Sequence, residues 1–227
     1  MQGRILDIAV GIRPERQSGW ASIDYVRPVP DLPVLPKTLL SLELMSQERC
    51  TELNEIADLL RQDLGAVARV FHFAKDEQAQ SEERLIRLED CISSIGVRGC
   101  LKILADSVVL PSSLWTAICR IWEHSAEIAE CCGRIAAEIG APVSEEDAYL
   151  VGLFHELDEF VEVLAWESKL LFVNHPAYVA QRVAEQWGLP DAVLQYFSER
   201  QSTGLQLLWR AIVDKAHFCC TRRLTLG

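Results

Sequence analysis

The chain has 227 residues, of which 49% are hydrophobic and 24% are charged, and its net charge is −11. This balance excludes a disordered chain, and the length suffices for one large domain or two small lobes. The acidic charge argues against a nucleic-acid-binding surface, because contact with phosphates needs clustered Lys and Arg. No apolar run approaches the ~20 residues that span a bilayer, and the first residues do not resemble a signal peptide. We therefore expect a cytoplasmic protein that binds neither nucleic acid nor membrane.

The eight cysteines indicate the same compartment. None of them forms a Cys-x-x-Cys pair, and two pairs are vicinal, Cys131-Cys132 and Cys219-Cys220. Vicinal pairs suit neither a zinc knuckle nor an ordinary disulfide framework. Most of the cysteines fall on apolar helical stripes, so we interpret them as small buried hydrophobes in a reducing cytoplasm. A redox role for the vicinal pairs is the alternative.

Residues 1–31 are predicted to form a separate N-terminal arm. A polar break at residues 13–19 interrupts it, and closely spaced prolines from Pro28 onward disfavour helix and favour an extended chain. Short strands and irregular extended segments both fit this composition. We expect the arm to pack on the domain or to mediate contacts, and the sequence assigns it no function.

Apolar periodicity predicts helices from residue 32 onward. Pro36 suits the first turn of a helix, and Gly96 suits the end of one. Pro111 stops an apolar helix that starts at Val97. These signals predict a bundle of about five short helices in residues 32–110.

The second half carries the longest predicted helix, Leu114–Ile139. Its apolar positions step alternately by four and three and therefore share one face, with His124 at the border of that face. Ser144 caps a helix that is expected to run as far as about Trp166. Further helices are predicted to begin at His175, Pro190 and Leu205. The predicted fold class is all-α, with about ten helices.

Polar residues inside these apolar helices mark a candidate site. His155 and Glu156 are adjacent, and a buried pair of this kind is costly unless it has a partner. His124 and Asp214, on separate helices, are companions with which the pair can enclose a divalent metal. The alternative is a hydrogen-bonded polar cluster without a metal, in which Asp214 pairs with His124 or His155. The other histidines are interpreted as a helix cap (His175) and as ordinary helix residues (His72 and His217).

Several motifs occur in an order that resembles a known family. The first half has Leu-Pro-Val-Leu-Pro at 32–36, Leu-Leu-Arg-Gln-Asp-Leu-Gly-Ala-Val-Ala-Arg at 59–69 and Leu-Glu-Asp-Cys-Ile-Ser-Ser-Ile-Gly at 88–96. The second half has His124, Gly-Leu-Phe-His-Glu-Leu at 152–157, His-Pro at 175–176 and Ile-Val-Asp-Lys at 212–215. Over about residues 32–220 this order is similar to the HDOD family of the HD-domain phosphohydrolase superfamily. The resemblance implies a two-lobed all-helical domain at 32–222, with lobes at 32–110 and 111–222.

The resemblance also implies a degenerate active site. In active members of the superfamily, a first His, an adjacent His-Asp pair and a final Asp hold a metal that activates water on phosphate esters. His124, His155 and Asp214 match three of these positions, but Glu156 replaces the Asp of the pair. Active relatives commonly continue with an apolar residue, Gly and Lys, whereas residues 157–159 are Leu-Asp-Glu. An acid thus replaces a cation that favours phosphate. We expect no catalytic residue and no bound cofactor.

The function implied by the resemblance is that of a non-enzymatic output or regulatory module in bacterial signal transduction. Such a module acts through a protein partner of the signalling pathway. The alternative is a metal-dependent phosphohydrolase that holds Fe, Mn, Zn or Ni through His124, His155, Glu156 and Asp214. A ligand sensor whose lobes close on a small molecule is a third hypothesis. The sequence has no Gly-rich phosphate loop, which excludes the ordinary nucleotide-binding motifs.

Overall fold

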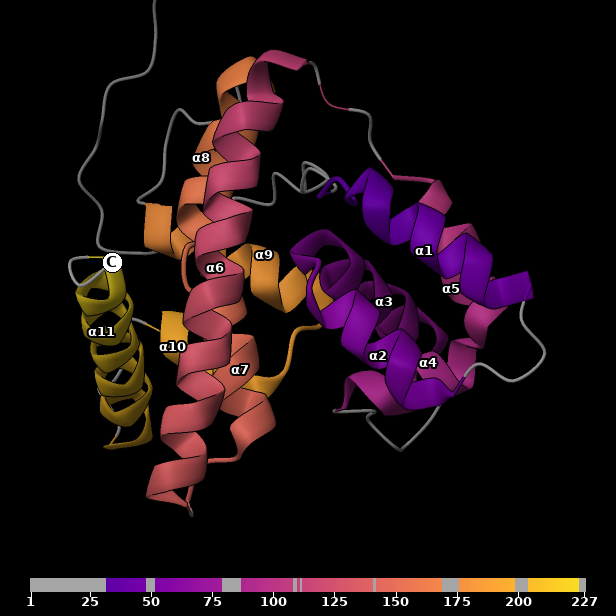
Figure 1. Ribbon diagram of the computed structural model, residues 1–227. Helices are drawn as coiled ribbons and strands as arrows, with labels where there is room; N and C mark the ends of the chain where they lie inside the picture. The colour runs from indigo at the N-terminus through magenta and orange to yellow at the C-terminus, as the bar shows by residue number, and fades with distance from the viewer. Residues whose placement is uncertain are drawn as a thin grey trace, which may run out of the picture.

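The computed structural model of the chain describes residues 32–47, 52–78, 87–107, 110, 112–140, 142–168, 176–198 and 204–224. Within these ranges the chain forms eleven helices and no strand (Figure 1). The predicted all-α fold class is confirmed. The predicted arm at 1–31 and the predicted cap at His175 lie outside the described residues.

The eleven helices exceed the expected number by one, because one expected helix is divided in two. None of the helices in the described ranges is long and apolar enough to cross a bilayer. In chain order they are α1 (Pro36–Gln47), α2 (Leu53–Arg61), α3 (Leu64–Gln78), α4 (Leu88–Ile95), α5 (Val97–Ala105), α6 (Ser112–Ile139), α7 (Glu145–Phe154), α8 (Leu157–Ser168), α9 (Pro176–Trp187), α10 (Asp191–Phe197) and α11 (Gly204–Leu224).

The first group of helices, α1 to α5, is held together near the start of α3. Asp63 is completely buried there. Its Oδ2 accepts a hydrogen bond from the Leu35 N–H at 2.8 Å, and its Oδ1 accepts one from the Ala66 N–H at 3.1 Å. A Cβ atom on Gly65 would lie 1.9 Å from the carbonyl oxygen of Pro33, so only glycine allows this approach. Residues 32–35 are therefore fixed against α3, and α1 begins at Pro36 as expected.

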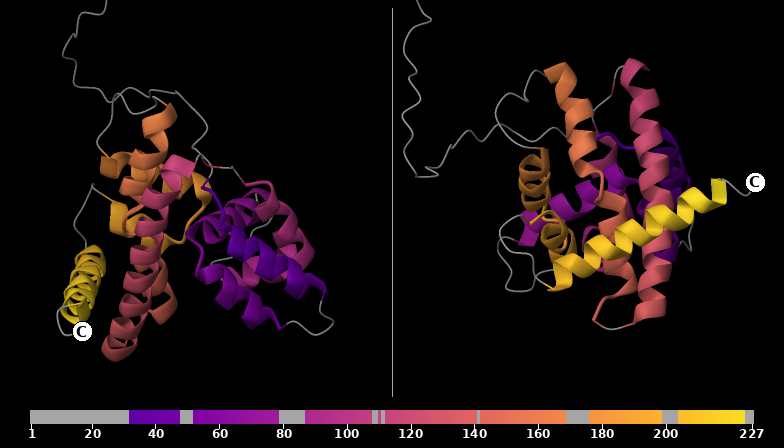
Figure 2. Two further views of the ribbon diagram at one scale, coloured as in Figure 1. Left: turned by 45° about the horizontal axis from the view of Figure 1, so that its top comes forward. Right: turned by 90° about the vertical axis from the view of Figure 1, so that its left-hand side faces the viewer.

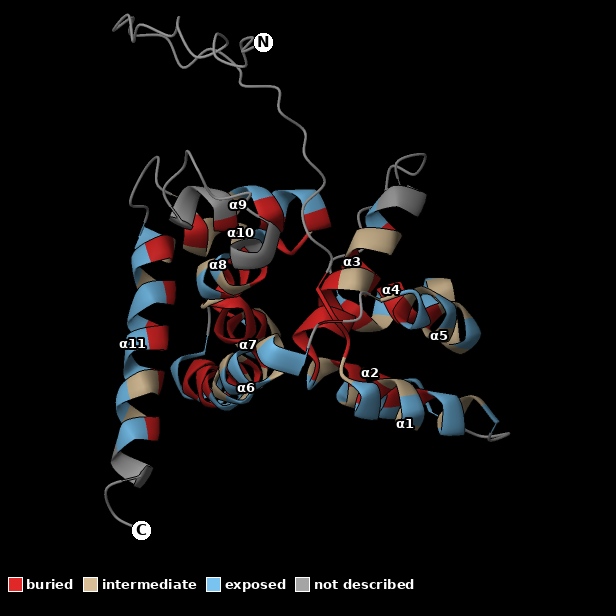
Figure 3. Cartoon of the chain, turned by 90° about the horizontal axis from the view of Figure 1, so that it is seen from above, coloured by how far each residue is buried: buried red, intermediate tan, exposed pale blue. Residues whose placement is uncertain are grey.

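Helix α6 is the axis of the second group, which comprises α6 to α11 (Figures 1 and 2). Its main neighbours are α7 and α11. The approach of α7 is close at Gly152, where a Cβ atom would lie 2.7 Å from the Cα atom of Ala129 and 3.0 Å from the Sγ atom of Cys132. In α11 the buried residues lie along the side that faces the other helices (Figure 3).

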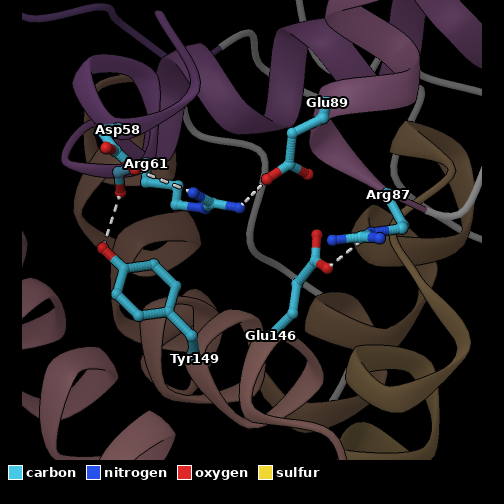
Figure 4. Close-up of polar contacts among 6 residues, drawn as sticks. All are labelled: Asp58, Arg61, Arg87, Glu89, Glu146 and Tyr149. Atoms are coloured by element: carbon cyan, nitrogen blue, oxygen red, sulfur yellow. Dashed lines mark hydrogen bonds and ion pairs between the residues drawn. The ribbon is translucent and has the colours of Figure 1, made fainter. Parts of the chain in front are cut away.

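The two groups meet through α3 and α9 and through polar contacts at α7 (Figure 4). The Tyr149 hydroxyl of α7 donates a hydrogen bond to the carbonyl oxygen of Arg61 in α2 at 3.1 Å. The Arg87 Nε atom lies 3.0 Å from the Oε2 atom of Glu146. Within the first group, the Arg61 guanidinium also pairs with Glu89 of α4. Arg61 of α2 is thus joined to α4 through its side chain and to α7 through its backbone carbonyl.

The helix expected from Ser144 to about Trp166 is divided at His155 and Glu156, which form a turn between α7 and α8. The His155 backbone is still in the right-handed helical region (φ −60°, ψ −27°), but its ring Nδ1 lies 2.6 Å from the carbonyl oxygen of Gly152. A side chain bonded to a helix carbonyl competes with the backbone N–H that would otherwise use it. The prediction of one continuous helix is wrong, and the His–Glu pair lies at a helix junction.

Seven cysteines of the described chain are free thiols, and most of them are buried. Burial raises the pKa of the Cys132 thiol to about 12, which keeps this thiol protonated and unreactive at neutral pH. The interpretation of the cysteines as small buried hydrophobes is confirmed for Cys91, Cys100, Cys131, Cys132 and Cys220.

Candidate metal centre at the junction of α7 and α8

His155 is a buried histidine with one unused ring nitrogen. It is 7% exposed. Its Nδ1 lies 2.6 Å from the carbonyl oxygen of Gly152, and since a carbonyl only accepts, we assign the ring proton to Nδ1. The other nitrogen, Nε2, then carries a lone pair. It is inaccessible to solvent and has no hydrogen-bond partner among the described residues. His155 therefore presents an unused acceptor to the interior.

Two other histidines approach His155 from different helices. His124 belongs to α6 and His217 to α11. The ring centroids lie 5.4 Å apart for His124 and His155, 5.0 Å for His124 and His217, and 4.9 Å for His155 and His217. One ligand nitrogen of each ring lies within 4.8 Å of the other two. We call these three residues the histidine cluster. It lies where α6, α11 and the α7–α8 turn meet.

Glu156 lies beside the histidine cluster. Its Oε1 atom is 3.3 Å from the Nε2 atom of His124 and 3.8 Å from the Nε2 atom of His155. The side chain is 19% exposed. Burial raises the pKa of Glu156 to about 7, and the charges of Glu159 and Asp158 act in the same direction. Near neutral pH this carboxyl is thus divided between its protonated and ionised forms.

Burial also keeps two of the histidines neutral. It lowers the pKa of His155 to about 4, and the neighbouring rings of His217 and His124 lower it further. The pKa of His217 is lowered by burial and by His124, against the opposing effect of Asp214. Both rings are therefore neutral near pH 7, which is the form that binds metals. A neutral His155 provides no positive charge for Glu156, so the 3.8 Å contact does not offset the rise in the Glu156 pKa.

Three of the four predicted site residues meet in the structure. His124, His155 and Glu156 lie together, whereas the side chain of Asp214 is exposed on α11. His217, less than one turn further along the same helix, lies in the cluster instead. The prediction that His217 is an ordinary helix residue is therefore wrong.

Helical phase is the signal that separates His217 from Asp214. At 100° per residue, His217 lies roughly 80° from the centre of the buried face of α11, and Asp214 lies roughly 140° from it. A residue at the edge of a buried face reaches neighbouring helices, whereas one near the opposite face reaches solvent. The buried residues that define this face are Trp209, Ile212, Val213, Ala216 and Cys220.

Three imidazoles and a carboxylate are suitable ligands for a divalent transition metal. Within the described residues, the three histidines of the cluster lie close enough together to hold such an ion. Glu156 lies beside two of them. Hydrolysis of a phosphate ester makes further demands. It needs an open position on the metal for water and a positive environment for the anionic substrate. Glu156, Asp158 and Glu159 instead make this environment acidic.

Similarity to known sequences is distant. Over 195 residues the chain is 23% identical to an uncharacterized protein of Treponema pallidum (strain Nichols). The alignment covers 73% of this chain but only 37% of the relative. The chain therefore spans little more than a third of the length of that relative.

The fold is similar to that of two proteins with solved structures. One is the MmoQ response regulator of Methylococcus capsulatus str. Bath, with a TM-score of 0.63 and 15% identity over 82% of this chain and 84% of that one. The other is a virulence factor of Campylobacter jejuni subsp. jejuni, with a TM-score of 0.54 and 14% identity over 82% of this chain and 76% of that one. At these identities the similarity concerns the fold alone.

The family model of the HDOD domain matches residues 32–171. The match covers more than half of the chain and includes the first group of helices, His124 and the His155-Glu156 turn. His217 lies beyond it. Family model, fold and motif order agree, and the chain belongs to the HDOD domain family.

Proposed function

We propose that this HDOD protein is a regulatory module of bacterial signalling that acts by binding a protein partner and not by catalysis. Membership of the HDOD family supports a signalling-related role. The likeness to the MmoQ response regulator is compatible with that role, although it concerns the fold alone.

The observation that carries the non-enzymatic part of the proposal is the position of Asp214. The metal set expected of a phosphohydrolase ends in this residue, yet its side chain is exposed on α11, outside the histidine cluster. Glu156 supplies a longer side chain than the Asp of an active His-Asp pair. Asp158 and Glu159 then place negative charge where a phosphate would approach.

The rival function is metal-dependent phosphohydrolysis, favoured by the convergence of His124, His155 and Glu156. It is tested by incubating the full chain and its His155→Ala variant with bis(p-nitrophenyl) phosphate and Mn²⁺, Fe²⁺, Zn²⁺ or Ni²⁺. We expect the same background rate from both proteins. Metal-dependent turnover that His155→Ala abolishes would instead establish the rival function.

An apolar strip on α1 is the first surface to test for partner binding. Leu40 and Leu44 are 60% and 57% exposed, and since they are four residues apart in α1 they lie one turn apart on the same face. A partner that covers them gains buried apolar area. Leu207 of α11 is 55% exposed and provides a matched control on the other group of helices.

The partner is sought by capture from the native bacterium and then studied in purified form. We expect the Leu40→Glu, Leu44→Glu double variant to bind it at least about tenfold more weakly, a loss of about 1.4 kcal/mol, and Leu207→Glu to bind it normally. The proposal of a protein-binding module is wrong if no specific partner is captured and metal-dependent hydrolysis is observed.

A further inference from the structure

The Nε2 atom of His155 is a buried acceptor that the protein itself does not satisfy. A polar atom in this position normally has a partner, because desolvation without a hydrogen bond costs about 1–3 kcal/mol. The opposite nitrogen, Nδ1, donates to the carbonyl oxygen of Gly152 at 2.6 Å. Metal-binding histidines have this arrangement: one nitrogen bonds to a carbonyl or carboxylate, which orients the ring, and the other binds the ion.

Two further imidazoles lie beside the ring of His155, with centroids 5.4 Å away for His124 and 4.9 Å away for His217. The ligand nitrogens of His124, His155 and His217 lie within 4.8 Å of one another. In a tetrahedral zinc site, with Zn–N distances of about 2.1 Å, the nitrogens are about 3.4 Å apart. The rings must therefore approach by about 1 Å. The partly exposed side chains of His124 and His217 have the freedom to do so.

Glu156 offers a fourth ligand beside two of these histidines. The Oε1 atom of Glu156 lies 3.3 Å from the Nε2 of His124 and 3.8 Å from the Nε2 of His155. These separations are close to those between ligands around a single ion. Three histidine nitrogens and one carboxylate oxygen complete the four-coordinate sphere of a structural zinc site, which has no open position for water.

We propose that His124, His155, His217 and Glu156 bind one divalent transition-metal ion of the zinc class, which fastens α11 to α6 and to the α7–α8 turn. Mg²⁺ and Ca²⁺ prefer oxygen ligands and do not suit three imidazoles. The closed sphere makes the ion structural, so the proposal is independent of the proposed partner-binding function. It replaces the expectation of a protein without a cofactor, which treated His217 as an ordinary helix residue.

The first test measures zinc binding by the full chain. Bound metal is first removed with a chelator, and the chelator is then removed by dialysis. The metal-free protein is titrated with ZnCl₂ by calorimetry. We expect one equivalent to bind, and we expect His217→Gln to weaken that binding at least about tenfold. His72→Gln is the matched control, because His72 lies on α3, outside the cluster, and its replacement should leave the affinity unchanged.

The second test identifies the ligand atoms. The buried cysteines of α6 and α11 are alternative ligands, and Co²⁺ distinguishes them because thiolate ligation adds intense charge-transfer bands in the near ultraviolet. We expect the visible spectrum of tetrahedral Co²⁺ without those bands. Charge-transfer bands that survive in His217→Gln would overturn the assignment to the histidine cluster.

The third test asks whether the ion fastens α11. Hydrogen–deuterium exchange is compared with and without one equivalent of Zn²⁺. We expect slower exchange in residues 204–224 of the wild type and of His72→Gln, and no such change in His217→Gln. Circular dichroism confirms that each variant is folded, and His217 is partly exposed, so its replacement does not open the core. The proposal fails if the wild type binds no zinc, or if His217→Gln binds it as tightly as the wild type.

Discussion

Asp63 is a buried carboxyl group whose ionisation opposes folding. Burial raises its pKa to about 6, although hydrogen bonds from Thr38 and from the Leu35 and Ala66 N–H groups act in the opposite direction. Its pKa in the folded protein is thus above the ordinary value of 3.8. The folded protein holds the proton more tightly, so this stabilisation is complete below about pH 4 and is lost as the pH rises through 6.

The Asp63→Asn variant isolates this effect because asparagine does not titrate. We expect the free energy of unfolding of the wild type, relative to the variant, to decrease by on the order of 3 kcal/mol between pH 4 and pH 7. Denaturant unfolding of both proteins at several pH values in this range gives the difference directly. If the difference in the free energy of unfolding between the two proteins stays constant across this pH range, the Asp63 pKa is not raised.

Two of the three cluster histidines were identifiable from the sequence as site residues. His124 stands at the border of an apolar stripe, and His155 adjoins Glu156 inside an apolar run. His217 also lies at the edge of an apolar face, but that signal is weaker because it stands among residues of mixed character, three positions after the more conspicuous Asp214. Its role depends on how α11 is rotated against α6, which is a tertiary property. The motif order therefore located the site but not its full set of side chains.

At the scale of the helix, the contact of α7 with α6 depends on a glycine. A methyl group on Gly152 would lie 2.7 Å from the Cα atom of Ala129, which is backbone and cannot move aside alone. Gly152 also supplies the carbonyl oxygen that orients the ring of His155. Any separation of the two helices at this point thus also displaces the histidine cluster.

We expect Gly152→Ala to decrease the free energy of unfolding by about 1–3 kcal/mol, as overpacking does. Gly133→Ala is the matched control in α6. A Cβ atom there would be no closer than 3.5 Å to its nearest neighbour, and alanine favours helix by up to about 1 kcal/mol. This control should be neutral or stabilising in thermal and denaturant unfolding. Equal losses in both variants would mean that the close approach at Gly152 is not the cause.

The ends of several helices were predictable because local signals determine them. Ser144 accepts a hydrogen bond from the Asp147 N–H at 3.0 Å, as expected of a cap, and Gly96 ends α4 with φ at 74°. The break after α7 was not predictable. It depends on the hydrogen bond of the His155 ring and on packing against α6. Neither leaves a break in the apolar periodicity of the sequence. Helix α5 likewise ends at Ala105, before the expected stop at Pro111.

At the scale of the molecule, specific contacts join the two groups of helices. The Lys75 Nζ atom of α3 donates a hydrogen bond to the carbonyl oxygen of Glu185 in α9 at 2.6 Å. The Tyr149 hydroxyl of α7 donates one to the carbonyl oxygen of Arg61 in α2. The Tyr149 bond is partly buried, so water replaces it poorly when it is lost. Arg87, in contrast, lies at the surface, where solvent screens its contact with Glu146.

These differences predict unequal effects of two substitutions at the same interface. We expect Tyr149→Phe to decrease the free energy of unfolding by about 1 kcal/mol, because one hydrogen bond is lost. Arg87→Ala should cause no measurable change, since its guanidinium is exposed. Denaturant unfolding at moderate salt tests both variants. A larger loss in Arg87→Ala than in Tyr149→Phe would contradict this assignment.

The distance in sequence between His155 and His217 also has a consequence for synthesis. Chains begin to fold from the N-terminal side while the ribosome is still adding residues. When α8 has emerged, His124 and His155 are already present, but α11, which approaches them in the finished fold, has not been made. Until it docks, water reaches the side of these rings that α11 later occupies. Docking of α11 therefore follows the synthesis of His124 and His155, and it completes the cluster by bringing His217 to them.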